Sequence, residues 1–106
     1  MDDFKWSAAE KKIAKRAFDA ALKRESEAVI AKLKGLAKNA ENPEDIWVIH
    51  DYLAGQRKIM DGKYDYRYSQ LIVVFGRLLR ERWLKDGDLD GLSEQKLQTI
   101  RHIASL

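Results

Sequence analysis

The sequence contains no cysteine and only one proline among its 106 residues. Without thiols the chain forms no disulfide and carries no thiolate chemistry, which is typical of proteins from a reducing compartment. No apolar run reaches 18 residues, so we expect no membrane span, and the acidic start at Asp2 and Asp3 predicts no secretory signal. At this length we expect one domain with a modest hydrophobic core.

The charge of the chain is mildly positive and unevenly distributed. The formal net charge is +3, and residues 1–40 hold ten Lys or Arg against six Asp or Glu. A balance this small does not indicate a polyanion-binding protein. We interpret the excess in the first part as the solvated face of a long helix, although it could also meet an acidic partner.

The first predicted element is one long helix. Ser7 and Glu10 have the spacing of a capping box, so the helix should begin near Ala8. No proline and only one glycine interrupt the good helix formers from there to about Lys38. About 30 helical residues correspond to roughly 45 Å.

A helix this long cannot be covered by the rest of so short a chain, which predicts packing against a second copy. Apolar residues recur along it at helical spacing, and a matching stripe occupies the following helix. The sequence therefore predicts a homodimer. The predicted dimer interface consists of Phe18, Leu22, Val29 and Leu33, together with Ile46, Ile49 and Leu53.

The second predicted helix carries the most unusual surface. Asn42 and Pro43 favour a start near residue 43, and Gly62 favours an end there. Opposite the apolar stripe, Trp47 stands among polar residues, a composition typical of binding or subunit surfaces. The polar residues around Trp47 on this face are His50, Asp51 and Arg57. The alternative is an ordinary solvated face whose tryptophan packs against a neighbouring helix.

Within this face, residue chemistry predicts separate roles. Arg57 offers a planar, permanently charged fork that suits a carboxylate. Asp51 is the expected counter-charge if Arg57 is paired within its own chain. We expect a third helix over about residues 65–84 and a fourth that begins after Ser93, which predicts an all-α protein of four helices with no sheet.

Three further chemistries have weaker support. The turn from Asp86 to Gly91 resembles the start of a calcium loop, but Leu97 occupies the position that requires a bidentate Glu. Adjacent His50 and Asp51 could suggest acid–base catalysis, yet no nucleophile motif or phosphate loop accompanies them. The basic and aromatic residues of 63–68 could touch nucleic acid, but acidic residues dilute them. We therefore expect a binding protein rather than an enzyme, with no metal and no cofactor.

The residues also carry a family resemblance. The pattern W-x-x-H-D-[YF]-L-x-x-x-R is present from Trp47 to Arg57, and D-G-K-Y-D follows from Asp61. With Arg67 and Phe75 in the next segment, these motifs resemble the fluorescence recovery protein family of cyanobacteria. The resemblance runs without a gap from Trp6 to Trp47 and covers essentially the whole chain.

This resemblance implies a dimer with a helical stem at about residues 7–62 and a helical head at about 63–106. It implies a regulator that binds the photoactivated red form of the orange carotenoid protein, speeds its return to the orange form and helps release it from the phycobilisome. The implied location is the cytoplasm, at the thylakoid surface in a cyanobacterium. The implied partner-binding residues are Trp47, His50, Asp51, Arg57, Asp61, Lys63, Tyr64, Arg67 and Phe75.

Two head positions differ from the cyanobacterial pattern. Val73 and Thr99 stand where those members carry Phe and Lys. Relatives of the family occur in bacteria without phycobilisomes, so a dimeric interaction protein with a different protein partner stays open as the alternative.

Overall fold

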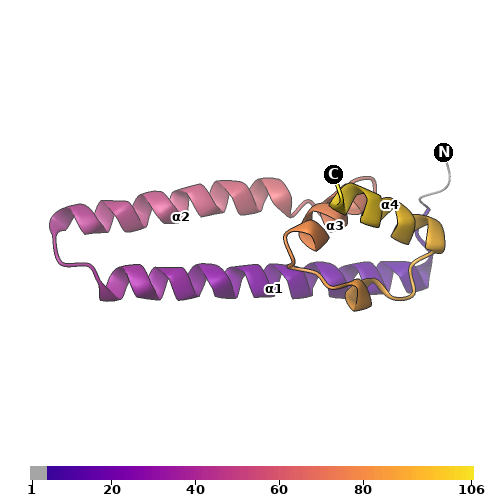
Figure 1. Cartoon of the computed structure of the whole chain (residues 1–106), viewed down its shortest axis with the longest axis horizontal. Helices are drawn as coiled ribbons and strands as arrows, with labels where there is room; N and C mark the ends of the chain where they lie inside the picture. Colours follow the sequence, from indigo (N-terminus) through magenta and orange to yellow (C-terminus); the bar gives the residue numbers. More distant parts are fainter. Residues whose placement is uncertain (1–4) are drawn as a thin grey trace.

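The computed structural model describes residues 5–106, so Asp2 and Asp3 lie outside the described residues. Figure 1 shows two long helices side by side and a group of shorter elements at one end. The elements are α1 (Ala8–Lys38), α2 (Pro43–Lys63), α3 (Leu71–Arg80), the 3₁₀ turn η2 (Asp86–Leu89) and α4 (Glu94–Ala104). The described chain contains helices and no strand, which confirms the all-α prediction. Its extents are 55 × 25 × 23 Å.

The starts of the helices follow the predicted caps. The Ser7 hydroxyl accepts from the Glu10 backbone N–H at 3.1 Å, and the Glu10 carboxylate accepts from the Ser7 N–H at 3.1 Å. At α2, the Asp45 carboxylate accepts from the Asn42 N–H at 3.0 Å while Pro43 occupies the first turn. The Ser93 hydroxyl caps α4. Each cap pairs residues three apart, so the local sequence contains the whole signal.

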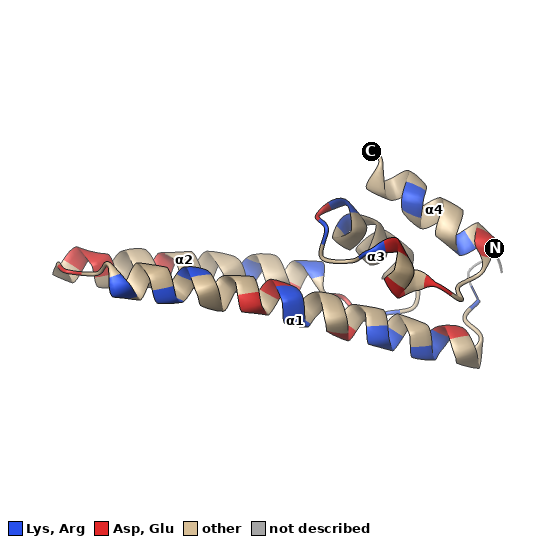
Figure 2. Ribbon diagram, turned by 60° about the horizontal axis from the view of Figure 1, so that its bottom comes forward, with Lys and Arg blue, Asp and Glu red and all other residues tan. Residues whose placement is uncertain are grey.

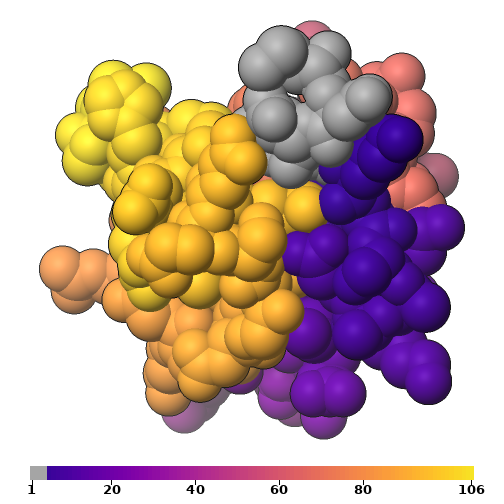
Figure 3. All heavy atoms as spheres, turned by 90° about the vertical axis from the view of Figure 1, so that its right-hand side faces the viewer, coloured from indigo at the N-terminus to yellow at the C-terminus, as the bar shows by residue number. Residues whose placement is uncertain are grey.

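The head is built from the first half of α1 and residues 64–106. The small side chains of Ala14, Ala17 and Ala21 are fully buried and let other elements approach α1 closely. The largest buried side chains of this core are Phe75, Leu71, Leu78, Leu89 and Ile100. Figure 3 views the head end-on, with the yellow and orange C-terminal residues packed beside the indigo start of α1. The second half of α1 and nearly all of α2 extend beyond this core as the stem (Figure 1).

The third helix is shorter than predicted at both ends. Residues 64–67 have no regular structure and residues 68–70 form a turn, so α3 begins only at Leu71. The rings of Tyr64 and Tyr66 pack edge-on against Phe18, with centroids 5.4 and 4.9 Å away. At the other end, Arg82 has a φ of 69°, in the left-handed region, and the chain leaves the helix there. The second helix was predicted more closely, since it ends at Lys63, one residue beyond Gly62.

A buried ion cluster joins the stem to the head; we call Glu25, Lys63, Tyr64 and Glu81 the junction cluster. The Lys63 ammonium is buried and lies 2.6 Å from a carboxylate oxygen of Glu25 and 2.6 Å from one of Glu81. The Tyr64 hydroxyl donates to the second Glu25 oxygen at 2.8 Å. The end of α2 is therefore tied both to the middle of α1 and to the end of α3.

Gly76 marks the closest approach of α3 and α4. A Cβ atom at this position would lie 2.7 Å from the Ile103 Cβ and 3.3 Å from the Ile100 carbonyl oxygen. Gly76→Ala should therefore destabilise the protein by about 1–3 kcal/mol through overpacking. Gly35→Ala is the matched control, because no atom lies within 4 Å and helix propensity favours alanine there by about 1 kcal/mol. Urea unfolding of both variants checks this; equal stabilities would contradict the close packing.

Three carboxylates make the fold sensitive to acid. Burial tends to raise the pKa of Glu10, but hydrogen bonds from the Ser7 and Ser93 backbone and from Lys96 outweigh it and lower that pKa. Burial is likewise outweighed at Glu81 by Lys63 and Arg77, and the Arg24 fork lowers the pKa of Asp88.

A pKa that is lower in the folded state adds stability above the unfolded pKa, and this stability is lost as pH falls through the folded pKa. The unfolded values are 4.5 for Glu and 3.8 for Asp. We expect the melting temperature to fall steadily below about pH 5. Replacing Glu10 and Glu81 with Gln should lower the melting temperature at pH 7 and flatten its acid dependence. An unchanged slope would contradict this account.

No helix in residues 5–106 is both long and apolar enough to cross a membrane. Within the same range, no group of three His, Asp or Glu side chains is placed to hold a metal. Two of the three carboxylates of the acidic turn pair with arginines: Asp88 binds Arg24 at 2.8 Å, and Asp86 lies 3.4 Å from Arg101.

Candidate protein-binding surface of the stem

The outer face of α2 exposes large apolar side chains. Of the 21 residues in this helix only Lys63 is buried. Ile46, Trp47 and Val48 keep 58%, 63% and 55% of their surface exposed. Consecutive exposed apolar residues that include a tryptophan are typical of protein interfaces rather than of a solvated helix face. Trp47 therefore does not pack against a neighbouring helix of its own chain.

Polar groups flank this apolar surface and are weakly held. The Trp47 and His50 rings meet edge-to-face with centroids 6.2 Å apart. The His50 Nδ1 lies 3.3 Å from an Asp51 carboxylate oxygen. Arg57 lies 3.7 Å from Asp61, so the expected pairing of Arg57 with Asp51 is not present. These groups are highly exposed, and such pairs contribute at most about 1 kcal/mol, so a partner can displace them at little cost.

A shallow apolar groove runs between the two stem helices beside Arg57. Its volume is about 260 Å³. The lining residues are Ser26, Val29, Ile30, Leu53, Gln56, Arg57 and Met60. Val29 and Leu53 are two of the predicted dimer residues and form part of the apolar floor of this groove. Arg57 places a permanent positive charge at the edge of that floor. We call Trp47, His50, Asp51, Arg57 and Asp61 the stem patch.

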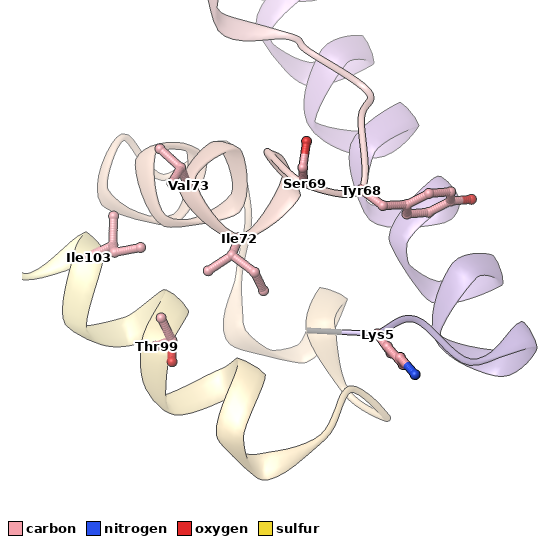
Figure 4. A pocket seen from close by; sticks show the side chains of 7 residues that line it. All are labelled: Lys5, Tyr68, Ser69, Ile72, Val73, Thr99 and Ile103. Carbon is pink, nitrogen blue, oxygen red and sulfur yellow. The ribbon is translucent and has the colours of Figure 1, made fainter. Parts of the chain in front are cut away.

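A second hollow, of about 530 Å³, lies on the head. Figure 4 shows Ile72 and Val73 of α3 on one side and Thr99 and Ile103 of α4 on the other. Val73 is the most exposed apolar residue of α3, at 55%. Both head positions that differ from the cyanobacterial pattern, Val73 and Thr99, therefore lie in one hollow.

Comparison with known proteins assigns the chain to a family. Residues 6–104 match the family model described as "Photoprotection regulator fluorescence recovery protein". The chain belongs to the fluorescence recovery protein family. The fluorescence recovery protein of Synechocystis sp. (strain ATCC 27184 / PCC 6803 / Kazusa) is 36% identical over 101 residues, which are 95% of this chain and 93% of that protein.

Solved structures of family members share the whole fold. The fluorescence recovery protein of Fremyella diplosiphon superposes with a TM-score of 0.91 at 38% identity and covers 96% of this chain and 100% of its own. The Synechocystis sp PCC 6803 protein gives 0.91 at 35% identity, with the same coverage. The resemblance inferred from the sequence motifs is thus confirmed, and family members are named as regulators of photoprotection.

The structure separates the implied partner-binding residues of the family into two groups. The stem patch is exposed, as a contact surface requires. Lys63 and Phe75 are buried, at 4% and 0% exposure, so neither can touch a partner in this conformation. Tyr64 is half-buried and bonded to Glu25, and exposed Arg67 binds its neighbour Asp65. The expectation was wrong for Lys63 and Phe75, because the place of a residue in a sequence motif does not tell how deeply its side chain is buried.

The predicted dimer residues also divide. Phe18 is buried in the head core at 7% exposure, so it serves the fold of one chain and the prediction was wrong for it. Leu22 is half-buried beside that core, and its place in a dimer interface stays a prediction. Val29, Leu33, Ile49 and Leu53 are half-buried in the stem, and Ile46 is exposed. Sequence reasoning missed Ile30, Val48 and Ile59, which are exposed on the stem at 45–55%. They lie outside the one apolar stripe from which the dimer interface was predicted. Apolar residues outside such a stripe are themselves a signal of a second buried face.

Proposed function

We propose that the protein binds the photoactivated red form of the orange carotenoid protein as a homodimer and speeds its return to the orange form. This action helps to release the carotenoid protein from the phycobilisome. Membership of a family of photoprotection regulators supports the role. The single observation that carries the site is the exposed, weakly paired stem patch beside an apolar groove.

Selective binding is sufficient for this activity, and no covalent step is needed. Tighter binding to the red form alone would shift the population toward the red form by the differential affinity. To speed the conversion, the protein must bind the transition state between the two forms more tightly than it binds the red form. Contacts that strengthen only as the partner closes toward its orange form would meet this requirement.

The stem patch offers contacts of this kind. Arg57 is extended and charged, so its guanidinium can take a bidentate carboxylate once water is excluded around it. Trp47 supplies rigid apolar area on the same helix, about 15 Å from Arg57 along the helix axis. Asp51 supplies an acceptor carboxylate and His50 a ring nitrogen on the same face. Tryptophan and arginine are among the residue types that most often dominate interface energies.

The test is binding to the carotenoid protein in both of its states. The protein is run with dark or illuminated orange carotenoid protein on a size-exclusion column under the matching light. We expect co-elution with the illuminated form at micromolar concentration and at least tenfold weaker binding to the dark form. Equal binding to both forms would contradict selective recognition, and binding to neither would contradict the choice of partner.

A different protein partner is the second candidate. Val73 and Thr99 differ from the cyanobacterial pattern and lie in the same head hollow, so the head offers a different surface from those relatives. If this candidate holds, Val73→Phe with Thr99→Lys should create or increase binding to the carotenoid protein. No effect of this double change would exclude the hollow as the reason for a different partner.

A further inference from the structure

Four cations gather on the head end of α1, at the end of the molecule away from the stem tip. Figure 2 shows blue segments along this part of the helix. They line a groove of about 550 Å³ together with two tyrosines of the chain that follows α2. We call this the basic groove; its residues are Lys11, Lys12, Lys15, Arg16, Tyr66 and Tyr68. The four cations span about 7.5 Å along the helix axis.

Most of this charge is unused by the fold. Among the described residues, Lys15 alone of the four has a carboxylate partner, Asp19 at 3.0 Å, and that pair is exposed. All four cationic side chains are exposed. The Lys11 ammonium lies 5.1 Å from the Tyr68 ring centroid and the Lys15 ammonium 5.6 Å from that of Tyr66. These contacts hold two ammonium groups over the tyrosine rings at the groove.

We propose that the basic groove binds an extended protein segment rich in Asp and Glu. Four cationic residues that span about 7.5 Å along the helix axis complement two or three carboxylates of such a segment. The site lies beyond the stem patch and does not depend on the proposed function, because its ligand is defined by charge and shape rather than by the carotenoid protein.

The geometry disfavours other polyanions. Single-stranded nucleic acid binds by stacking bases on aromatic rings. Here each of the two tyrosine rings already has a lysine ammonium over it, and the Tyr66 ring also packs on Phe18 with centroids 4.9 Å apart. Stable attachment to a membrane surface usually combines basic charge with apolar side chains that insert, and the groove residues include no aliphatic side chain.

The tyrosine hydroxyls add directional contacts. Burial, together with Tyr68 and Asp19, raises the pKa of Tyr66 to about 12, so its hydroxyl stays protonated at neutral pH. A protonated phenol donates a hydrogen bond to a carboxylate beside the ammonium groups. Tyr66→Phe with Tyr68→Phe should therefore weaken peptide binding about threefold while keeping the salt dependence.

The experiment measures binding of a fluorescein-labelled octaglutamate peptide by anisotropy, with the full chain at low salt. Lys12→Glu with Arg16→Glu reverses two charges in the groove. Lys32→Glu with Lys34→Glu reverses two exposed charges farther along the same helix, so both variants lower the net charge of +3 by four. We expect at least tenfold weaker binding in the groove variant and less than a twofold change in the control. Circular dichroism must show equal helix content in both.

Three results would overturn the proposal. The first is that the parent protein does not bind the peptide. The second is that both variants lose affinity equally, which would reveal only a net-charge effect. The third is that the groove variant loses more affinity for duplex DNA or phosphatidylserine vesicles than for the peptide. None of these measurements uses the carotenoid protein, so the result is separate from the test of the proposed function.

Discussion

Lys63→Ala should lower the free energy of unfolding by about 3–5 kcal/mol. The Lys63 ammonium neutralises Glu25 and Glu81, and its removal leaves two carboxylates facing each other at the junction of stem and head. Glu25 is buried at 6% exposure, so water cannot replace the lost ammonium there. An uncompensated buried charge is among the most destabilising changes a point mutation makes.

Thermal melting checks this prediction. For a domain of this size, such a loss lowers the melting temperature by more than about 10 °C. Lys58→Ala is the matched control, because Lys58 is an exposed lysine of the same helix; it should change stability by less than about 0.5 kcal/mol. Similar melting temperatures for the two variants would show that the junction cluster is not a structural tie.

Ile46→Glu should convert a dimer to a monomer. Ile46 is 58% exposed within one chain, so the substitution costs one chain little, but it places a charge in the seam that a second copy is proposed to cover. Stable homodimers bury on the order of 2,000 Å² or more. The stem offers apolar area for such an interface on both helices, through Ile30, Val48 and Ile59 in addition to Ile46 and Trp47.

Light scattering on a size-exclusion column measures the effect. At micromolar concentration the parent should have a mass of about twice the 12.3 kDa of one chain. The Ile46→Glu variant should have the mass of one chain, 12.3 kDa. Val73→Glu is the control, since Val73 is equally exposed but lies on the head; it should remain dimeric. A monomeric parent, or loss of the dimer in the Val73 variant alone, would contradict a stem interface.

The parts of the fold that follow from local chemistry were predictable. Ser7, Asn42 and Ser93 mark helix starts because a cap and its backbone partner lie within three residues. The extended segment before α3 was missed, although Tyr64, Tyr66 and Tyr68 alternate with polar residues and a period of two indicates an extended chain. The left-handed turn at Arg82 has no local signal, since neither its type nor its neighbours favour a positive φ.

How deeply a side chain is buried was harder to predict than which helix carries it. The partners of Lys63 lie 38 and 18 residues away in sequence, so only the packed head reveals that this lysine is buried. Phe75 was assigned to a binding surface by resemblance, but it is fully buried in the head core. Trp47, His50 and Arg57 were placed on an exposed face correctly, because helical periodicity alone separates the two sides of α2.

Recovery kinetics of the orange carotenoid protein test the central proposal most directly. The red form is produced by illumination, and its return to the orange form is followed by absorbance in the dark, with the parent, Arg57→Leu or Lys58→Leu added. We predict that the parent and the Lys58 variant accelerate recovery equally and that Arg57→Leu loses at least tenfold of the acceleration with an unchanged melting temperature. Recovery as fast with Arg57→Leu as with the parent would contradict the stem patch as the functional site.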